Sequence, residues 1–170
     1  MPLRRRDLLF GLGGLALSGA KAARAAPGVI KADGILVLKA ARTLHLLQHR
    51  ASVATYPIAL GAHPIGPKRR AGDSRTPEGH YRIDGRNPDS PYHLALHISY
   101  PNAADAARAR AARRDPGGNI CLHGLPDGYE ALDPAAWNVD WTRGCIAVSD
   151  RAIEEIWARV DDGTPIEIRP

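Results

Sequence analysis

Two short segments of the sequence carry residues that could form a thiol nucleophile and its base. His123 is followed by Gly124, and Gly144 precedes Cys145 at the start of an apolar run. A thiol becomes a nucleophile when a base takes its proton, and nearby backbone N–H groups can hold the oxyanion that forms on a carbonyl substrate. The chain has only two cysteines, Cys121 and Cys145, so the choice of nucleophile is narrow. The pattern predicts thiol-dependent acyl transfer, with Cys145 as nucleophile and His123 as general base and acid.

The same residues also have plainer interpretations. A cysteine in an apolar run can pack as a small hydrophobic side chain, and two cysteines in an exported protein can form a disulfide. A Cys121–Cys145 disulfide would consume the nucleophile, so we expect both thiols to be free and Cys121 to be largely buried. A metal site formed by Cys121, His123 and Cys145 is a further alternative, but no pair of these residues has zinc-finger spacing. We therefore expect no metal and no cofactor.

Short strands are the elements that would position these side chains. Runs rich in β-branched and apolar residues occupy residues 35–38, 43–47, 52–60, 81–83, 93–98, 119–123, 145–148 and 165–168. Residues 103–114 are rich in Ala and Arg and predict a helix that ends before Pro116. A second helix is expected after Ser149 or Asp150, because apolar residues follow at helical spacing. The fold class is therefore mainly β with two short helices, a β-sandwich or a partly closed barrel.

Alternation along two strands predicts which side chains face the same way. In strand 93–98, Leu96 and Ile98 lie on one face and His97 on the other, and in strand 119–123 Cys121 shares a face with His123. A long loop rich in Pro and Gly, residues 63–79, precedes strand 81–83. Cys121 is therefore expected close to the candidate site.

The first 25 residues have the composition of an export signal. Arg4, Arg5 and Arg6 form a basic start, residues 8–20 are apolar, and the Ala-x-Ala site at residues 23–25 predicts cleavage. The arginine pair favours the twin-arginine route, although the general secretory route remains open. The apolar run is too short for a stable membrane span. We predict a twin-arginine-like signal peptide at residues 1–25, a catalytic domain at residues 30–170, a periplasmic location and no stable membrane insertion after cleavage.

The net charge of +5 comes largely from this leader. Five of the 23 basic residues and one of the 18 acidic residues precede residue 26, which leaves 18 basic against 17 acidic. A nearly neutral domain lacks the excess of positive charge that is typical of nucleic-acid binding. We expect no nucleic-acid partner.

Taken together, the motifs resemble the YkuD family of L,D-transpeptidase catalytic domains. The signature of that family is a His-Gly pair, followed at a distance by Ser or Thr, a basic residue, Gly, Cys and an apolar residue. Here these positions are His123, Gly124, Thr142, Arg143, Gly144, Cys145 and Ile146. Upstream segments resemble the family's substrate-side loop, namely residues 56–61, 66–68, 72–73, 76–79 and 81–83. The resemblance covers nearly all of the chain that follows the leader.

Three features depart from the usual family pattern. Arg143 stands where a second histidine is frequent, Ala147 and Val148 stand where Arg or Asn often follows the cysteine, and 18 residues separate His123 from Thr142. The chain resembles a divergent branch of murein enzymes, which includes an amidase that cuts a lipoprotein from peptidoglycan. The resemblance therefore does not decide whether the acyl group is transferred to an amine or released by hydrolysis.

The resemblance implies a mechanism on peptidoglycan stem peptides. His123 would take the proton of Cys145, whose thiolate would attack a peptide carbonyl and form a thioester. The backbone N–H groups of Gly144 and Cys145 would hold the oxyanion, and the carbonyl of Gly124 would orient the imidazole.

The expected substrate contacts lie around this pair. Arg143, Thr142, Trp141 and His97 are the candidate substrate-binding residues. Arg143 could bind a substrate carboxylate, or it could lower the pKa of the thiol as a nearby cation. The expected partner is peptidoglycan, with a peptidoglycan-linked lipoprotein as a second candidate. Three functions remain open: acyl transfer to an amine, hydrolysis as an amidase, and peptidoglycan binding without catalysis.

Overall fold

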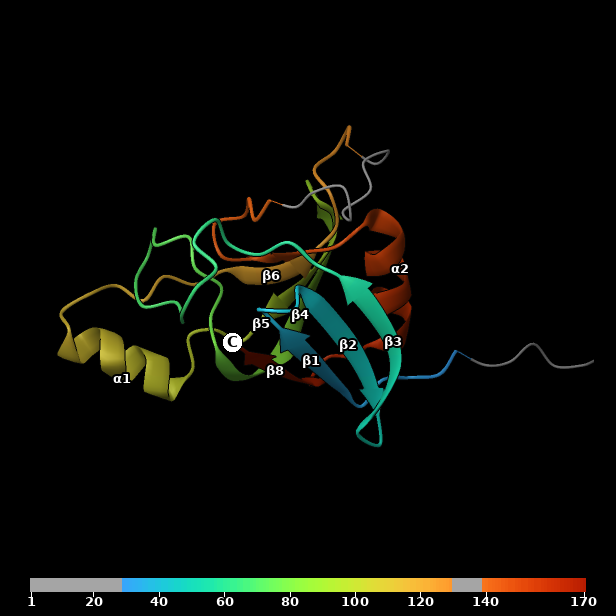
Figure 1. Ribbon diagram of the computed structural model, residues 1–170, viewed down its shortest axis with the longest axis horizontal. Helices are drawn as coiled ribbons and strands as arrows, with labels where there is room; N and C mark the ends of the chain where they lie inside the picture. Colours follow the sequence, from blue (N-terminus) through green and yellow to red (C-terminus); the bar gives the residue numbers. More distant parts are fainter. Residues whose placement is uncertain (1–28, 130–138) are drawn as a thin grey trace, which may run out of the picture.

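A computed structural model describes residues 29–129 and 139–170 as one sheet and two helices (Figure 1). The helices are α1 (Ala103–Ala111) and α2 (Asp150–Arg159). The strands are β1 (Gly34–Leu38), β2 (Thr43–Gln48), β3 (Ala51–Pro57), β4 (Gly79–Ser90), β5 (His93–Ile98), β6 (Ile120–His123), β7 (Ile146–Ala147) and β8 (Pro165–Arg169). The expected signal peptide, residues 1–25, lies outside the described residues, and its cleavage and the domain boundaries stay predictions.

The sheet has eight strands in the order β3-β2-β1-β8-β4-β5-β6-β7. Two neighbouring pairs are parallel, β1 with β8 and β6 with β7, and the other pairs are antiparallel. The parallel β6–β7 pair matters most for the site, because β6 ends at His123 and β7 begins directly after Cys145. Two segments that lie far apart in the sequence are therefore brought side by side at one edge of the sheet.

Strand β4 is much longer than the predicted strand 81–83, because it pairs with two different neighbours. Its first part pairs with β8 and its later part with β5. Gly85, Asn87 and Pro88 gave no sequence signal for a continuing strand. The register with β5 shifts after Ile83 and again after Asn87, and such irregularities bend a strand and increase its twist. The bent β4 turns the two halves of the sheet toward each other.

The far edges of the sheet meet without a continuous strand pairing. Ala59, just after β3, and Ala147 of β7 exchange two backbone hydrogen bonds of 2.9 Å each. Farther along, the N–H of Thr142 donates to the Leu60 carbonyl at 3.0 Å. The predicted fold class, mainly β with two short helices, is confirmed, and the partly closed barrel describes it better than a sandwich.

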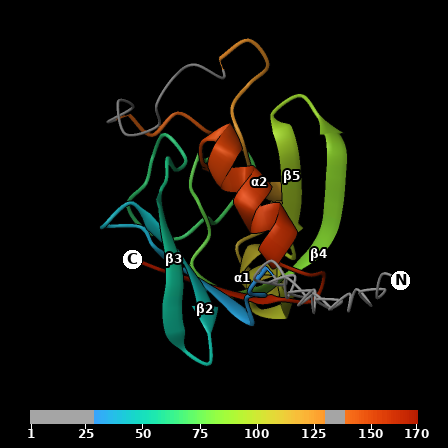
Figure 2. The ribbon, with the colours of Figure 1, turned by 90° about the vertical axis from the view of Figure 1, so that its right-hand side faces the viewer.

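Helix α2 covers the core between the two halves of the sheet. In Figure 2 it lies between the β2–β3 hairpin and strands β4 and β5. Its N-cap is Ser149, whose Oγ accepts the N–H of Ala152 at 3.1 Å, and its apolar face buries Ile153 and Ile156 completely. These side chains join a core that is otherwise built from the inward faces of the strands. The periodicity of the sequence was sufficient to predict this helix.

Helix α1 lies at the opposite end of the molecule from α2 (Figure 1) and is shorter than predicted. Asn102 caps its start by accepting the N–H groups of Ala104 and Asp105 at 3.0 Å. Residues 103–114 were expected to be helical, but the helix ends at Ala111, and Arg113 has a positive φ of 51°, which lies outside the right-handed helical region. The N–H of Arg114 donates back to the Ala109 carbonyl at 2.9 Å, which completes a Schellman motif. Local helix propensity could not predict this early end.

Two buried lysines hold the loop between β3 and β4. Lys39 is 2% exposed, and its ammonium donates to Glu78 Oε1 at 2.7 Å and to the Gly66 carbonyl at 2.8 Å. Lys68 is also buried, and its ammonium donates to Asp73 Oδ1 at 2.9 Å. Buried charges are tolerated only when they are paired and hydrogen-bonded, as they are here. These paired lysines therefore stabilise the conformation of the loop that resembles the family's substrate-side loop.

Low pH should destabilise this loop, because Asp73 becomes protonated. Burial disfavours its ionised form, but four donors outweigh that effect and lower its pKa: the N–H groups of Arg69, Arg70 and Arg75 and the ammonium of Lys68. A carboxyl with a lower pKa in the folded chain stabilises the fold above its unfolded pKa, and this contribution is lost as pH falls through the folded value. We expect the free energy of unfolding to decrease below about pH 4, and Asp73→Asn to remove part of that dependence. Urea unfolding over a pH series measures both; identical pH dependences in the two proteins would contradict the prediction.

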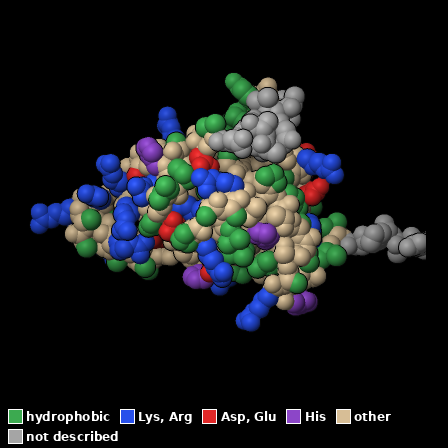
Figure 3. Space-filling view, in the orientation of Figure 1, with side chains coloured by type: hydrophobic (Ala, Val, Ile, Leu, Met, Phe, Trp, Pro, Cys, Tyr) green, Lys and Arg blue, Asp and Glu red, His purple; other side chains and the backbone are tan. Residues whose placement is uncertain are grey.

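The charge of the domain is unevenly distributed. Figure 3 shows Lys and Arg side chains gathered at the end of the molecule that carries α1. Arg108, Arg110, Arg113 and Arg114 are all exposed there. Within the described ranges, no helix is long and apolar enough to cross a membrane.

Candidate active site

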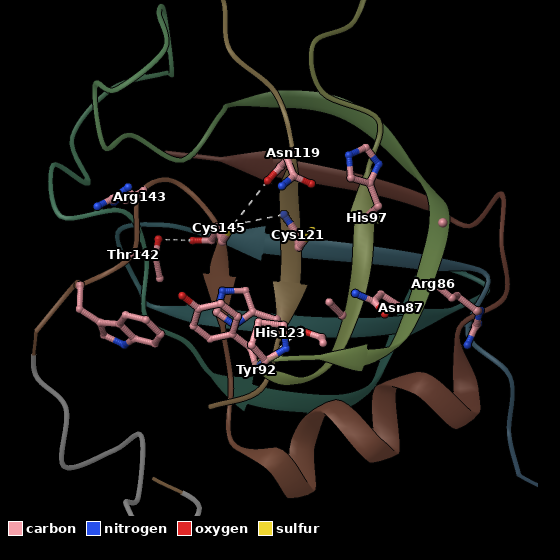
Figure 4. A pocket seen from close by; sticks show the side chains of 15 residues that line it. Arg86, Asn87, Tyr92, His97, Asn119, Cys121, His123, Thr142, Arg143 and Cys145 are labelled. Atoms are coloured by element: carbon pink, nitrogen blue, oxygen red, sulfur yellow. Dashed lines mark hydrogen bonds between the residues drawn. The ribbon is translucent and has the colours of Figure 1, made fainter. Parts of the chain in front are cut away.

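A cavity of about 830 Å³ opens along strands β4, β5 and β6 and the turn before β7 (Figure 4). It contains both residues of the predicted catalytic pair, His123 and Cys145. Of the predicted substrate-binding residues, it also contains His97, Trp141, Thr142 and Arg143. The structure therefore brings together side chains that are spread over nearly 50 positions of the sequence.

Cys145 is half-buried at the floor of this cavity. Its Sγ accepts the backbone N–H of Cys121 at 3.4 Å and lies 3.8 Å from the Asn119 carbonyl, to which the thiol can donate. Both cysteines are free thiols, as predicted, although Cys121 is only half-buried. The sulfur is thus held against β6 while one side remains open to the cavity.

The surroundings of Cys145 favour its ionised form. A hydrogen bond from the Cys121 side chain lowers the pKa of the Cys145 thiol, burial raises it, and the hydrogen bond and charge of His123 lower it further. The net result is a pKa well below the usual value of a thiol. The complementary effect raises the pKa of Cys121, chiefly through its hydrogen bond to Cys145 and then through burial. The surroundings of the pair therefore favour the thiolate on Cys145 over that on Cys121.

His123 is fixed by its own backbone and by two aromatic rings. It is 4% exposed, and its Nδ1 lies 2.7 Å from the Gly124 carbonyl, so Nδ1–H donates there and Nε2 is left to accept a proton. The ring of Tyr92 lies 4.5 Å from the imidazole between centroids, and that of Trp141 lies 5.9 Å away, edge to face. This tautomer and orientation are those that a base for Cys145 requires.

Gly124 is required by close packing. A Cβ built on it would lie 2.5 Å from Asp150 Oδ1 and 3.0 Å from the Tyr92 carbonyl. The same Asp150 oxygen accepts the N–H of Leu125 at 2.7 Å. The start of α2 therefore packs directly against the residue whose carbonyl orients His123.

The turn before Cys145 is held by Thr142. Its Oγ1 donates to the Cys145 carbonyl at 2.7 Å and accepts the Gly144 N–H at 3.0 Å, and the side chain is 4% exposed. Thr142 therefore shapes the turn and also lines the cavity, and its predicted contact with substrate stays a prediction. Gly144 has φ 130°, and a Cβ there would lie 2.7 Å from the Arg75 carbonyl.

The same hydrogen bond bears on the predicted oxyanion role of Gly144, which stays a prediction. Its N–H already donates to Thr142 Oγ1, so it would have to leave that partner before it could hold a substrate oxygen. The physical reason is the tight turn, in which a threonine two residues earlier reaches the glycine N–H. Gly144 is needed at this turn for its positive φ.

The remaining predicted substrate contacts have different surroundings. Arg143 is exposed, and Figure 4 shows its side chain directed away from Cys145. The groups that lower the pKa of Cys145 include Cys121 and His123. The predicted substrate-binding role of Arg143 stays a prediction. His97 lies on β5 beside Cys121 and pairs with Asp84 at 2.5 Å. Trp141 stacks on Tyr92 with 6.2 Å between ring centroids.

Sequence reasoning missed Tyr92 and Asn119 as site residues. Tyr92 lies in the turn between β4 and β5, and only the fold places it on His123. Its backbone carbonyl also accepts the Gly124 N–H at 3.1 Å. Asn119, with φ 54°, directs its carbonyl at the Cys145 sulfur. No sequence signal marked Tyr92, because a tyrosine in a turn is usually a surface residue. Among the described residues, no three potential ligands are grouped for a metal ion.

Known proteins are similar to this chain in sequence and in fold. Among curated proteins, YafK of Escherichia coli (strain K12), given as a candidate L,D-transpeptidase, is 30% identical over 129 residues, which are 72% of this chain and 45% of YafK. The crystal structure of the helical cell shape determining protein Pgp2 from Campylobacter jejuni has a TM-score of 0.62 and 26% identity, covering 79% of this chain and 46% of Pgp2. Bd1075 from Bdellovibrio bacteriovorus has a TM-score of 0.57 and 28% identity, covering 80% of this chain and 47% of Bd1075.

This chain thus spans less than half the length of each of these relatives. A family model, YkuD, described as the L,D-transpeptidase catalytic domain, matches residues 32–168. That match includes every residue of the cavity, and it covers far more than half of the chain. The chain therefore belongs to the YkuD family of L,D-transpeptidase catalytic domains.

Proposed function

We propose that this protein transfers acyl groups of peptidoglycan stem peptides through a thioester on Cys145. The observation that carries the proposal is the pairing of Cys145, a thiol with a lowered pKa, with an imidazole whose Nδ1–H is held by the Gly124 carbonyl. A catalytically silent binding module has no need for a thiol with a lowered pKa. Family membership supports the same conclusion, since L,D-transpeptidases act on peptidoglycan.

The proposed reaction has two halves. In the first, the Cys145 thiolate attacks the peptide carbonyl, and the C–N bond breaks as His123 gives its proton to the leaving amine. In the second, an amine or a water molecule loses a proton to His123 and attacks the thioester carbonyl. The C–S bond then breaks, which restores the Cys145 thiolate beside the protonated His123. An amine acceptor gives a cross-link or an exchanged amine, whereas water gives hydrolysis. The cavity holds one nucleophile and one base, which is sufficient for both halves.

Charge around the cavity suits a substrate that carries carboxylates. Arg143 lies at the rim of the main cavity and also lines a neighbouring cavity of about 460 Å³, together with Lys68. A guanidinium can hold a carboxylate through two parallel hydrogen bonds. Peptidoglycan stem peptides carry free carboxylates, so we propose Arg143 as their binding residue. His97 and Trp141 complete the proposed substrate contacts on either side of the catalytic pair.

The proposed location is the periplasm, because peptidoglycan lies outside the cytoplasm and residues 1–25 have the composition of an export signal. The proposed partner is peptidoglycan itself. A lipoprotein linked to peptidoglycan is the alternative substrate, and water would then be the acceptor. The name of Pgp2 connects that relative with helical cell shape, and we propose a role in the cell wall for this chain as well.

Acylation by a carbapenem tests the nucleophile. We expect intact-mass measurement to find one adduct per wild-type chain, because the strained β-lactam carbonyl reacts with an activated thiolate. Cys145→Ala should form no adduct, whereas Cys121→Ala should keep the ability to form one. A soluble, folded wild-type protein without an adduct would contradict the proposal.

Defined muropeptides then identify the acceptor. Incubation of the wild-type protein with a tetrapeptide donor and a separate amine acceptor should give a cross-linked product if an amine resolves the thioester. A shortened donor without cross-linked product would instead indicate hydrolysis. Cys145→Ala should be inactive in both cases, which separates either activity from a contaminating enzyme.

A further inference from the structure

The second cysteine of the chain lies directly beside the proposed nucleophile. Strands β6 and β7 are parallel, with Leu122 opposite Ile146 and His123 opposite Ala147. One step back along both strands, the same register sets Cys121 opposite Cys145. Both side chains line the same cavity, and the Cys121 N–H lies 3.4 Å from the Cys145 sulfur (Figure 4).

The strand pairing is compatible with the spacing that a disulfide requires. Neighbouring strands lie about 4.8 Å apart, and disulfides join residues whose Cα atoms are about 4.4–6.8 Å apart. The two thiols can therefore be joined without unfolding the sheet. The shared cavity admits a small oxidant to the Cys145 sulfur, which is only half-buried.

The two thiols also differ in pKa, as is needed when one thiol reacts with an oxidant and the other then attacks the oxidised sulfur. The lowered pKa of Cys145 favours its thiolate and therefore its reaction first, whereas the hydrogen bond between the two raises the pKa of Cys121 and favours its protonated form. Oxidation of Cys145 to a sulfenic acid removes the negative charge that holds the Cys121 proton. The second thiol then becomes easier to ionise, with its target sulfur already beside it.

We propose that Cys121 is a resolving thiol, which closes a reversible disulfide with Cys145 after a hydroperoxide has oxidised Cys145. The inference rests on the proposed role of Cys145 as the ionised nucleophile. It adds a second functional residue to the site and a reversible state in which acyl transfer is off. It also gives the nucleophile protection, because sulfenic acids that meet no thiol proceed to irreversible sulfinic and sulfonic acids.

The chemistry balances in two steps. The Cys145 thiolate attacks one oxygen of the peroxide, an S–O bond forms, the O–O bond breaks, and the departing hydroxide takes a proton to become water. The Cys121 sulfur then attacks the Cys145 sulfur, an S–S bond forms, and the S–O bond breaks as the hydroxyl leaves with the Cys121 proton as water. Two thiols have then lost two electrons and two protons in total, and the peroxide has been reduced to water.

Peroxide treatment of the full chain tests the proposal. The reduced wild-type protein, Cys121→Ala and Cys121→Ser are each exposed to hydrogen peroxide, denatured, alkylated and examined by intact mass and peptide mapping. We expect the wild-type chain to lose two hydrogens and both free thiols, with peptides containing Cys121 and Cys145 linked within one chain. The two variants should instead gain two or three oxygens at Cys145. Cys145→Ala should leave Cys121 unoxidised at the same dose.

Recovery after reduction gives a second, independent measurement. With dithiothreitol, the wild-type protein should regain nearly all of the carbapenem acylation it had before peroxide, and each Cys121 variant less than about a tenth of its own starting value. Wild-type protein that gains oxygens at Cys145 while Cys121 stays free would overturn the proposal. A disulfide that forms only between two chains would overturn it as well.

The two proposals fail in different ways. A wild-type chain that forms the internal disulfide but takes no carbapenem adduct would defeat acyl transfer and leave the thiol pair intact. A chain that takes the adduct but never forms the disulfide would overturn only the role of Cys121. The wild-type peptide map decides the second case even if a Cys121 variant fails to fold.

Discussion

Replacing His123 by alanine should slow carbapenem acylation of Cys145 by about 10²–10⁴-fold, the usual contribution of a positioned general base. The imidazole is buried, its Nδ1–H is held by the Gly124 carbonyl, and Tyr92 and Trp141 pack against it, so no other described side chain can take its place without rearrangement. The Cys145 thiol should still be present in His123→Ala, where the number of free thiols can be measured. Stopped-flow or mass-based acylation rates measure the effect.

The pH dependence of the same variant makes the test specific. His123 lowers the pKa of the Cys145 thiol, so its removal should raise that pKa and move the acylation profile toward higher pH. Below the new pKa the thiol is protonated and unreactive, and the rate should recover as pH rises through it.

His80→Ala is the matched control for His123→Ala. The His80 side chain is 82% exposed, and the residue does not line the cavity, so its loss should leave both the rate and the pH profile as in the wild type. An unchanged rate in His123→Ala, or the same loss in both variants, would contradict the role of His123.

Lys39→Ala should lower the free energy of unfolding by about 3–5 kcal/mol, the usual cost of leaving one partner of a buried pair alone. Lys39 is 2% exposed, and burial lowers its pKa against the opposing effect of Glu78. Its ammonium donates to Glu78 and to the carbonyls of Gly66 and Thr76. Alanine would leave all three acceptors without this donor, and urea unfolding followed by circular dichroism measures the loss.

An exposed lysine pair provides the control. Lys31 lies 2.6 Å from Asp161, a shorter separation than that of Lys39 from Glu78, but the two side chains are 54% and 66% exposed. Exposed pairs contribute about 0–1 kcal/mol, so Lys31→Ala should change stability little. Equal losses in the two variants would show that burial of Lys39 is not the source of the effect.

The stability of this loop bears directly on the site. Lys39 holds the segment that contains Arg75, and the Arg75 carbonyl lies 2.7 Å from the position that a Cβ on Gly144 would take. A loosened loop would therefore release the turn that presents Cys145. We expect a Lys39→Ala protein that still folds to acylate more slowly than the wild type.

The sequence was sufficient for elements whose signal is local. Helix α2 followed from apolar residues at helical spacing and from Ser149 as N-cap, and most strands followed from short β-type runs. Prediction from the sequence failed where an element depends on contacts with residues far away in the chain. Strand β4 continues past Gly85 because β5 pairs with it, and the predicted strand at residues 52–60 ends at Pro57 because the following residues turn to meet Ala147.

Residue types and spacing alone identified Cys145 and His123 as the candidate pair, because few other residues in this chain could serve as a thiol nucleophile and its base. The family followed from the same motifs, as the YkuD match shows. The tertiary structure decided what surrounds them: Tyr92 on the imidazole, the Gly144 N–H committed to Thr142, and Cys121 opposite Cys145. The sequence states which residue types can act as nucleophile and base. The distances between residues far apart in the chain depend instead on the strand register, which only the folded sheet determines.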